Sequence, residues 1–360
     1  MGYSENNIKK KVFVAMSGGV DSSVAALLLK DIGYDVTGVT MCLGIREDGD
    51  RTRCCGLDAI DDAKHVCNQL QIPHFVFDFA QEMEEHVINK FTAEYQRGRT
   101  PNPCIDCNRY LKFGALLGKA RGIGFDYLAT GHYARIEKRR ESWHLLRPKD
   151  KIKDQTYFLY PIKVDDLSSI LFPLGGLTKD EVRDLAKKAG LAVAHKAESQ
   201  DICFVTQGDY RQFILDKAGT MKPGDIVNKK GKILGRHRGI LYYTIGQRSG
   251  LGISAKEPLY VVDIDAGDNR IIVGTKTDLK AVGLLAGDLN LLTDDLPAEA
   301  MAKIRYRKKP AHCRVIKEEN QLRIIFEEVQ ESITPGQAVV LYAGDEVLGG
   351  GVIEKVIRSL

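Results

Sequence analysis

A segment near the start of the chain, rich in glycine and serine, has the composition of a phosphate-binding loop. Residues 17–23 (SGGVDSS) lie between an apolar run that predicts a strand and another that predicts a helix. Glycine lets the backbone turn tightly and approach a ligand, and the N–H groups that begin a helix attract an anion. The hydroxyls of Ser17, Ser22 and Ser23 add donors, and the Asp21 carboxylate is the kind of oxygen ligand that Mg²⁺ prefers. The segment predicts a nucleotide site, with an ordinary strand-to-helix turn as the alternative.

Three of the eight cysteines stand in segments that suggest a reactive thiol. Cys104 and Cys107 form a C-x-x-C pair in residues 101–108 (PNPCIDCN), where two prolines indicate a loop that leads into a helix. A thiol at a helix N-terminus has a stabilised thiolate, so Cys107 is a candidate nucleophile. Cys203 stands in the polar segment 198–204 (ESQDICF). A redox pair or a zinc site is the alternative for the C-x-x-C, although a zinc site usually shows a second close pair of ligands. We assign no role to the remaining cysteines, which are Cys42, Cys54, Cys55, Cys67 and Cys313.

Alternating strands and helices, up to about residue 200, must position these side chains. Apolar runs predict the strands, and apolar residues at helical spacing predict the helices between them. Such alternation is typical of an α/β fold with a doubly wound parallel sheet. The expected strands cover 11–16, 35–41, 74–79 and 127–130, the expected helices cover 24–30, 57–70 and 110–120, and Met83, Val87, Phe91 and Tyr95 form a further apolar stripe.

A capping signal marks one later helix. Thr178 and Glu181 have the spacing of a capping box, and Leu177 and Val182 have that of a hydrophobic staple. Gly190 is placed to end the helix. We expect this helix to be structural.

The pattern changes near residue 208, where short Val- and Ile-rich runs alternate with turn-rich pairs. Short strands with frequent turns predict β-structure. We therefore expect three domains: an α/β domain over 1–207 that carries the glycine-rich loop and the C-x-x-C segment, a small β-rich central domain over 208–276 and a C-terminal β-barrel domain over 277–360.

Composition and charge indicate an ordinary globular enzyme. The 360 residues include 52 basic and 48 acidic side chains, a balance that permits nucleic-acid binding without predicting it. The longest apolar run is far shorter than the roughly 20 residues that span a bilayer, and the start of the chain lacks the apolar region of a secretory signal. We expect a cytoplasmic protein with no membrane contact, whose cysteines are thiols, ligands or catalysts rather than disulfides.

Motifs along nearly the whole chain resemble the bacterial tRNA-specific 2-thiouridylases of the PP-loop ATP pyrophosphatase superfamily. The loop at 17–23, the C-x-x-C segment and the ESQDICF segment occur in the family's order, and the Gly-Lys-Ser/Thr ending of a Walker loop is missing. The likeness continues in residues 129–134 (ATGHYA), 153–158 (KDQTYF), 244–248 (TIGQR) and 305–306 (RY).

The resemblance implies a two-stage reaction. ATP, with Mg²⁺, would adenylate the C2 carbonyl of the wobble uridine in tRNAs for Lys, Glu and Gln, and sulfur would then replace AMP. Cys107 would be the catalytic nucleophile, and Cys203 would carry the sulfur as a persulfide, so that a Cys107–Cys203 disulfide remains to be reduced. The implied partners are tRNA and a sulfur donor, either a persulfide-carrying relay protein or sulfide, and we expect a monomer.

The resemblance also implies two sets of binding residues. The ATP-binding set is Ala15, Met16, Ser17, Gly18, Gly19, Val20, Asp21, Ser22, Met41 and Gly131. The tRNA-binding set is Asn102, Pro103 and Cys104, near the target base, together with Lys153, Asp154, Gln155, Arg305 and Tyr306.

Cys104 departs from the best-known family pattern, because many relatives have Asp at this position. Three thiolates, those of Cys104, Cys107 and Cys203, would suffice to hold a [4Fe–4S] cluster with one iron open to sulfide. That route needs no persulfide on Cys203, and both routes stay open.

Basic residues gather in 147–153, 228–238 and 303–314. In the last of these, Tyr306 stands among basic neighbours, which suits phosphate contact and stacking on a base. A solvated basic face is the alternative. Two rival functions remain: a PP-loop enzyme that delivers nitrogen to a carbonyl, such as a lysidine-forming enzyme or a small-molecule synthetase, and an RNA-binding protein whose ATP loop is a relic.

Overall fold

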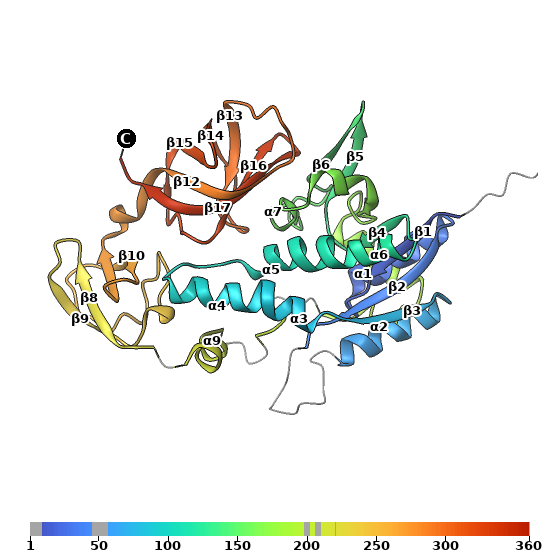
Figure 1. The fold of residues 1–360 in the computed structure, drawn as a ribbon, viewed down its shortest axis with the longest axis horizontal. Helices are drawn as coiled ribbons and strands as arrows, with labels where there is room; N and C mark the ends of the chain where they lie inside the picture. The colour runs from blue at the N-terminus through green and yellow to red at the C-terminus, as the bar shows by residue number, and fades with distance from the viewer. Residues whose placement is uncertain (1–8, 45–56, 198–201, 206–209, 220, 360) are drawn as a thin grey trace, which may run out of the picture. The chain divides into compact units, whose positions relative to one another are not determined.

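The computed structural model describes residues 9–44, 57–197, 202–205, 210–219 and 221–359 (Figure 1). These residues form two compact units. The first unit comprises Met1–Glu84 and Asp106–Gln200, and the second comprises Glu85–Ile105 and Asp201–Leu360. Within the described ranges, no helix has the length and apolar character needed to span a bilayer.

The first unit is built on a parallel sheet, as predicted. Its strands are β1 (Lys11–Ala15), β2 (Asp35–Cys42), β3 (His74–Asp78), β4 (Tyr127–Thr130) and β7 (Ile170–Leu171), in the order β3-β2-β1-β4-β7. Every neighbouring pair is parallel. Val12, Phe13 and Val14 of the central strand β1 are fully buried, as expected for a strand that is covered on both faces.

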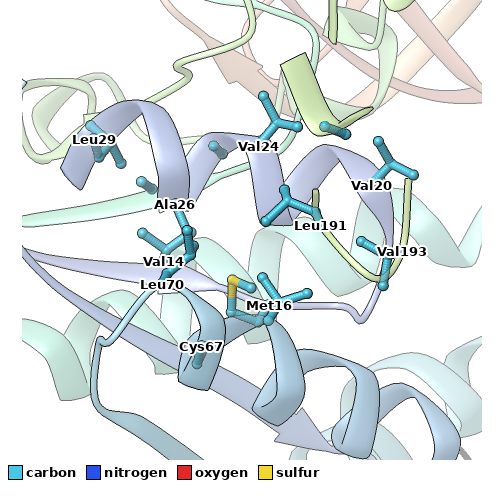
Figure 2. Packing of buried hydrophobic residues seen from close by; sticks show 14 of the residues in the cluster. Val14, Met16, Val20, Val24, Ala26, Leu29, Cys67, Leu70, Leu191 and Val193 are labelled. Carbon is cyan, nitrogen blue, oxygen red and sulfur yellow. The ribbon is translucent and has the colours of Figure 1, made fainter. Parts of the chain in front are cut away.

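Helices α1 (Val20–Asp31), α2 (Leu57–Gln69) and α8 (Lys179–Lys188) pack apolar residues into one core with β1. Figure 2 shows Val14 of β1 and Met16, which directly follows β1, in this core with Val20 and Val24 of α1. Helix α1 begins at Val20, four residues earlier than predicted, so the glycine-rich segment runs straight into it. The capping box of α8 is confirmed, since Thr178 accepts from the Glu181 N–H and Glu181 accepts from the Thr178 N–H.

The helix predicted over 110–120 begins earlier. It runs without a break through α5 (Pro103–Asp106), η2 (Cys107–Leu116) and α6 (Leu117–Gly122), and η2 has the wider π-helical register. Pro103 occupies the first helical position, where a missing N–H costs nothing. The prolines therefore mark a helix start, and the prediction that the C-x-x-C lies in a loop is wrong.

The remaining elements of this part of the chain are short. The predicted apolar stripe is confirmed in α3 (Ala80–Met83), η1 (Glu84–Ile88) and α4 (Asn89–Gln96), because all four of its residues are buried. Other elements are the antiparallel hairpin β5 (Arg135–Arg139) and β6 (Ser142–Leu146), and the short helices α7 (Thr156–Leu159) and η3 (Val164–Ser169).

The C-terminal part of the second unit, from Asp201 on, contains a helix that the sequence patterns missed. Helix α9 (Tyr210–Ala218) lies in the region predicted to be β-rich, and Tyr210 stacks on Tyr95 of α4 with ring centroids 4.8 Å apart. A sheet follows in the order β10-β11-β8-β9, with the short helices η4 (Ile240–Tyr242) and η5 (Lys276–Leu279). Its strands are β8 (Gly224–Asn228), β9 (Ile233–His237), β10 (Tyr260–Asp265) and β11 (Arg270–Gly274).

The C-terminal strands form the predicted closed β-barrel. They follow one another in the antiparallel order β12-β15-β14-β13-β16-β17, and β12 also pairs with β17, which closes the sheet. The strands are β12 (Lys280–Leu291), β13 (Glu299–Lys303), β14 (Ala311–Lys317), β15 (Leu322–Glu331), β16 (Ala338–Ala343) and β17 (Glu346–Ile357).

Candidate active site

The segment after β1 has the geometry of an anion-binding loop. Gly18 has a φ of +67°, and a Cβ atom there would collide with the Ala59 carbonyl, so only glycine fits. The Ser22 and Ser23 hydroxyls both donate to the Gly19 carbonyl, at 3.2 and 2.8 Å. Ser23 is fully buried, so its hydroxyl organises the loop and the expectation that it binds a ligand is wrong. Ser17 is exposed at the open side of the loop.

Three other predicted ATP-binding residues lie at the same edge of the sheet, where the parallel strands end. Ala15 ends β1, and the Met16 N–H that follows donates to the Val39 carbonyl of β2 at 2.8 Å. Met41 lies near the end of β2. Parallel α/β sheets bind their ligands at this edge.

Gly131, directly after β4, packs against the loop itself. A Cβ atom at Gly131 would lie 2.7 Å from the Asp21 carbonyl carbon and 2.7 Å from the Ser22 nitrogen. Because the backbone approaches so closely, no larger side chain fits without moving the loop. The structure thus brings Gly131 to residues about 110 positions before it.

Two lysines that the sequence patterns did not single out also reach the loop. The Lys179 ammonium donates to both Asp21 carboxylate oxygens, at 2.7 and 2.9 Å, and the Tyr133 hydroxyl donates to one of them at 2.9 Å. The Lys196 ammonium donates to the Gly18 carbonyl at 3.0 Å and pairs with Asp62. Their separations from the loop, 158 and 178 positions, left no local signal.

The Asp21 carboxylate fits the role of a Mg²⁺ ligand. Mg²⁺ bound to a nucleotide usually takes one or two carboxylates together with the phosphates and water. Lys179 holds both carboxylate oxygens, so a metal ion bound there must share or displace this ammonium. Across the parts of the chain that the structure describes, no group of three or more His, Cys, Asp or Glu side chains is arranged to hold a metal ion.

Cys107 lies in the second turn of the long helix. Its side chain is buried, with 9% of the residue exposed. Burial raises the pKa of the Cys107 thiol, the nearby Lys112 charge opposes that rise, and Asp106 adds to it. The expectation that a helix N-terminus stabilises the Cys107 thiolate is therefore wrong, because the residue lies in the second turn and is nearly excluded from solvent.

Cys104 and Cys203 are exposed thiols. Cys104 lies one helical turn before Cys107. The backbone at Cys203 is fixed by the next residue, Phe204, which is buried with its ring 5.2 Å from that of Phe91 in α4. Residues 198–201 of the ESQDICF segment lie outside the described residues. Cys107 and Cys203 belong to different units, and their approach stays a prediction.

The segment that leads to Cys104 is fixed by the C-terminal barrel within the second unit. The Thr100 N–H donates to the Pro335 carbonyl at 3.0 Å, and the Gln337 amide donates to the Thr100 carbonyl at 2.8 Å. Asn102 is partly buried and Pro103 is buried. The loop before β16 thus orients the residues predicted to approach the target base.

Arg305 and Tyr306 lie between β13 and β14 of the barrel. The Arg305 guanidinium donates to the Ile245 carbonyl at 3.3 Å and to the Thr334 hydroxyl, which joins it to the TIGQR segment. The Lys303 ammonium lies over the Tyr306 ring, 5.3 Å from its centroid. The structure therefore joins two motifs, RY and TIGQR, that are about 60 residues apart in the sequence.

Comparison with known proteins identifies the family. Three family models match consecutive parts of the chain: a tRNA methyl transferase HUP domain over 10–207, a tRNA methyl transferase PRC-barrel domain over 211–275 and an aminomethyltransferase beta-barrel domain over 281–353. The tRNA-specific 2-thiouridylase MnmA 1 of Syntrophus aciditrophicus is 58% identical over 99% of this chain and 96% of its own length. The tRNA-specific 2-thiouridylase MnmA of Carboxydothermus hydrogenoformans is 50% identical over 96% of this chain and 98% of its own length. The tRNA-specific 2-thiouridylase MnmA of Clostridium botulinum is 48% identical over 97% of this chain and 99% of its own length. The chain belongs to the tRNA-specific 2-thiouridylase family.

The family models and the relatives carry different activity names. Two of the models are described as tRNA methyl transferase domains, whereas the full-length relatives are named 2-thiouridylases. The names of the relatives decide the family, because the relatives match nearly the whole chain at high identity, whereas each model describes one domain.

Residues 153–155, which the family resemblance assigns to tRNA contact, are buried or partly buried. Asp154 is buried, and its carboxylate accepts from Arg147 at 2.7 Å and from the Thr156 N–H at 3.0 Å. The Gln155 side chain accepts from the Tyr133 N–H at 2.8 Å, and Lys153 is half-buried. In this structure Gln155 orders the backbone at Tyr133, two residues after Gly131, and Asp154 orders the backbone at Thr156. Their contact with tRNA stays a prediction.

The other cysteines differ in burial and in disulfide bonding. Cys67 and Cys313 are core residues, and burial raises their thiol pKa values to about 11 and about 12. Cys42 is disulfide-bonded, which contradicts the expectation that the cysteines form no disulfides. Cys54 and Cys55 lie outside the described residues.

Proposed function

We propose that the chain is a tRNA-uridine 2-sulfurtransferase that uses ATP to activate the C2 carbonyl of the wobble uridine and replaces its oxygen with sulfur. The observation that carries the proposal is the site at the end of β1. There, Gly131, Lys179 and Lys196 pack against the anion-binding loop of residues 17–23. The chain is also 58% identical to a 2-thiouridylase over nearly its whole length. The substrates are the tRNAs for Lys, Glu and Gln.

The loop serves the first stage of the reaction. Its backbone N–H groups and the start of α1 bind the ATP phosphates. The uridine O2 attacks the α-phosphate, pyrophosphate leaves, and the adenylated oxygen becomes a good leaving group. The proposed ATP site is formed by Ala15, Met16, Ser17, Gly18, Gly19, Val20, Asp21, Ser22, Met41 and Gly131. Asp21 would hold Mg²⁺ there, and the ion would neutralise phosphate charge.

The thiols serve the second stage. The terminal sulfur of a persulfide on Cys203 attacks C2, and AMP leaves with the original oxygen. The Cys107 thiolate then attacks Sγ of Cys203, which releases the product as 2-thiouridine and leaves a disulfide for an external reductant. In this route the sulfur comes from a persulfide-carrying relay protein, which transfers it to the Cys203 thiol at the oxidation level of a persulfide. The alternative route delivers sulfide from an iron–sulfur cluster on Cys104, Cys107 and Cys203.

The remaining assignments complete the proposal. Asn102, Pro103 and Cys104 approach the target base, and Lys153, Asp154, Gln155, Arg305 and Tyr306 contact the tRNA. The enzyme acts as a monomer with domains over 1–207, 208–276 and 277–360. Base-modifying enzymes extrude the target base, which brings it from the anticodon loop to the thiols.

Cys107→Ser and Cys203→Ser test the function directly. Each variant is expected to abolish formation of 2-thiouridine, measured by nucleoside mass spectrometry, while ATP binding persists because the loop is intact. Full activity of Cys107→Ser would favour a nitrogen-delivering enzyme. Failure of the wild-type protein to release pyrophosphate with tRNA and sulfide present would favour an RNA-binding protein with a relic loop.

Cys104→Asp separates the two sulfur routes. The persulfide route needs no thiol at this position, so the variant is expected to keep its activity if that route operates. A cluster route loses a ligand and is expected to fail. Iron and sulfide analysis of the anaerobically purified protein, with its visible spectrum, gives a second and independent readout.

A further inference from the structure

Lys196 holds the anion-binding loop on the side that faces helix α2. Its ammonium donates to the Gly18 carbonyl at 3.0 Å and pairs with the Asp62 carboxylate. Asp62 lies three residues after Ala59 on α2, and the Ala59 carbonyl is the group that a Cβ atom at Gly18 would meet. Positions three apart are neighbours on a helix surface. The face of α2 that packs against the loop therefore also carries the carboxylate that fixes the ammonium.

The backbone that carries Lys196 is fixed by the core of the first unit. Leu191 and Val193 are buried in the same apolar cluster as Val20 of α1 (Figure 2). The Lys196 N–H donates to the Val193 carbonyl at 2.9 Å. Packing thus places the start of this side chain, and the two hydrogen-bond partners place its end.

The direction of the Gly18 carbonyl decides the direction of an N–H donor in the loop. The Gly18 C=O and the Gly19 N–H belong to one trans peptide plane, in which they point in opposite directions. Lys196 holds the carbonyl oxygen on the α2 side, so the Gly19 N–H points away from α2. This N–H has no hydrogen-bond acceptor among the described residues, which leaves it available to a ligand.

The next peptide of the loop is held in a different way. The Gly19 carbonyl accepts from the Ser22 and Ser23 hydroxyls and from the Ser23 N–H, all in the first turn of α1. The Val20 N–H therefore points away from these groups, and within the described ranges it too has no acceptor. Local residues fix this second peptide, whereas the peptide before it depends on Lys196.

We propose that Lys196, anchored by Asp62, is the positioning residue that aims the Gly19 N–H at the phosphates of ATP. The inference deepens the proposed function, since it rests on the loop as the ATP site. Gly18 has a φ of +67°, and the backbone of a glycine has a wide choice of conformations, so its carbonyl needs a donor to keep one direction. Because Asp62 balances the ammonium, the pair adds no net charge beside the loop, and its contribution is the orientation of the peptide.

Lys196→Met tests this role without tRNA. We expect the Kd for ATP, measured with Mg²⁺ by equilibrium dialysis, to rise about tenfold, the usual cost of losing one hydrogen bond to a charged group. The Lys196 and Asp62 side chains are 40% and 39% exposed, and such pairs add little stability, so the Tm is expected to stay close to wild type. The matched control is Lys10→Met, which removes an exposed pair with Asp126 at the other end of β1 and is expected to leave the Kd unchanged.

Asp62→Asn separates positioning from charge. If Lys196 acted by its charge alone, loss of the carboxylate would raise the local positive charge and tighten ATP binding. Positioning predicts the opposite, a Kd several-fold higher, because the ammonium loses its anchor. A wild-type Kd in Lys196→Met, or a Kd in Asp62→Asn at or below that of wild type, would overturn the inference. A wild-type protein that binds ATP but forms no 2-thiouridine would instead contradict the proposed function and leave this inference standing.

Discussion

At the residue scale, the Lys179–Asp21 pair sets the charge balance of the phosphate loop. An aspartate at a site for a triphosphate repels the ligand unless a cation compensates it. The Lys179 side chain is only 9% exposed and holds both Asp21 oxygens, whereas the Asp21 side chain is 33% exposed, so the ammonium is shielded from solvent and the carboxylate stays accessible to a ligand. Asp21 would hold Mg²⁺ in the proposed ATP complex, and the Lys179 ammonium, displaced from the carboxylate, would then be available to a phosphate oxygen.

Lys179→Met removes this compensation. We expect the KM for ATP, measured by tRNA-dependent pyrophosphate release, to rise by tenfold to about a hundredfold, because an uncompensated carboxylate remains beside the phosphates. The matched control is Lys187→Met on the same helix, where the ammonium is half-exposed and pairs with Asp184 at 3.9 Å. An unchanged KM in Lys179→Met would show that this ammonium has no part in nucleotide binding.

Several site residues were predictable because their signal is local. The two glycines and Asp21 stand together between a strand and a helix, so the phosphate loop follows from composition and neighbours alone. Lys179 and Lys196 carry no such signal, since folding alone brings them across more than 150 positions. The environment of Cys107 was mispredicted for a related reason. Its pKa depends on burial by distant elements, which the helix-terminus rule does not include.

At the element scale, helix α8 fixes the position of Lys179. Lys179 is the first helical residue, directly after the Thr178 cap, and its N–H donates to Asp150 at 3.0 Å. The capping box was predicted from sequence and confirmed, but the helix is more than structural, because it aims a buried ammonium at the loop. The π register of η2 was not predictable, since it depends on hydrogen-bond geometry and leaves no clear periodicity in the sequence.

The cap of α8 predicts a pH-dependent contribution to stability. Hydrogen bonds from Lys149 and from the Thr178 N–H lower the pKa of the Glu181 carboxyl to about 2. A carboxyl with a lowered pKa stabilises the fold above its unfolded-state pKa, and this contribution is lost as the pH falls toward about 2. Glu181→Gln keeps an acceptor for the Thr178 N–H but loses the charge that pairs with Lys149, so it is expected to lower Tm by about one or two degrees at neutral pH.

Measuring the Tm of wild type and Glu181→Gln at lower pH checks the direction of this pH dependence. The difference in Tm between wild type and Glu181→Gln is expected to shrink below about pH 4, as the wild-type carboxyl approaches its own titration. Asp180→Asn is the control, because Asp180 is exposed in the same first turn and takes no part in the capping box. A difference that grows as the pH falls would contradict the assignment.

At the scale of the whole molecule, sequence reasoning recovered the parallel sheet and the barrel but not the contacts within the second unit. Residues 85–105 were predicted to belong to the catalytic domain, and they form a compact unit with the C-terminal half of the chain. The reason is physical. Phe91 and Tyr95 of α4 are buried against Phe204 and Tyr210, and Thr100 is bonded to the loop before β16, so distant apolar and backbone partners decide the packing. The division at residues 207 and 276 stays a prediction.

Gly336 makes that long-range contact testable. Its φ is +91°, and a Cβ atom there would lie 2.8 Å from the Thr100 nitrogen. Gly336→Ala is therefore expected to displace residues 99–101 and with them Asn102, Pro103 and Cys104, which follow directly. Because small misplacements near reacting groups cost up to about a hundredfold in rate, we expect 2-thiouridine formation to fall by tenfold to about a hundredfold. ATP binding, measured by equilibrium dialysis, is expected to persist, since it depends on residues of the first unit.

Gly267→Ala in the same unit is the control for Gly336→Ala. Gly267 lies in the turn between β10 and β11, has no positive φ, and a Cβ atom there would come no closer than 3.4 Å to the Asp265 side chain, which is an ordinary contact. If both variants form 2-thiouridine at the wild-type rate, the barrel does not position the segment that leads to the C-x-x-C. If Gly336→Ala alone is slow and binds ATP normally, a contact between residues 236 positions apart sets the rate of sulfur transfer, and the C-terminal barrel is part of the catalytic apparatus.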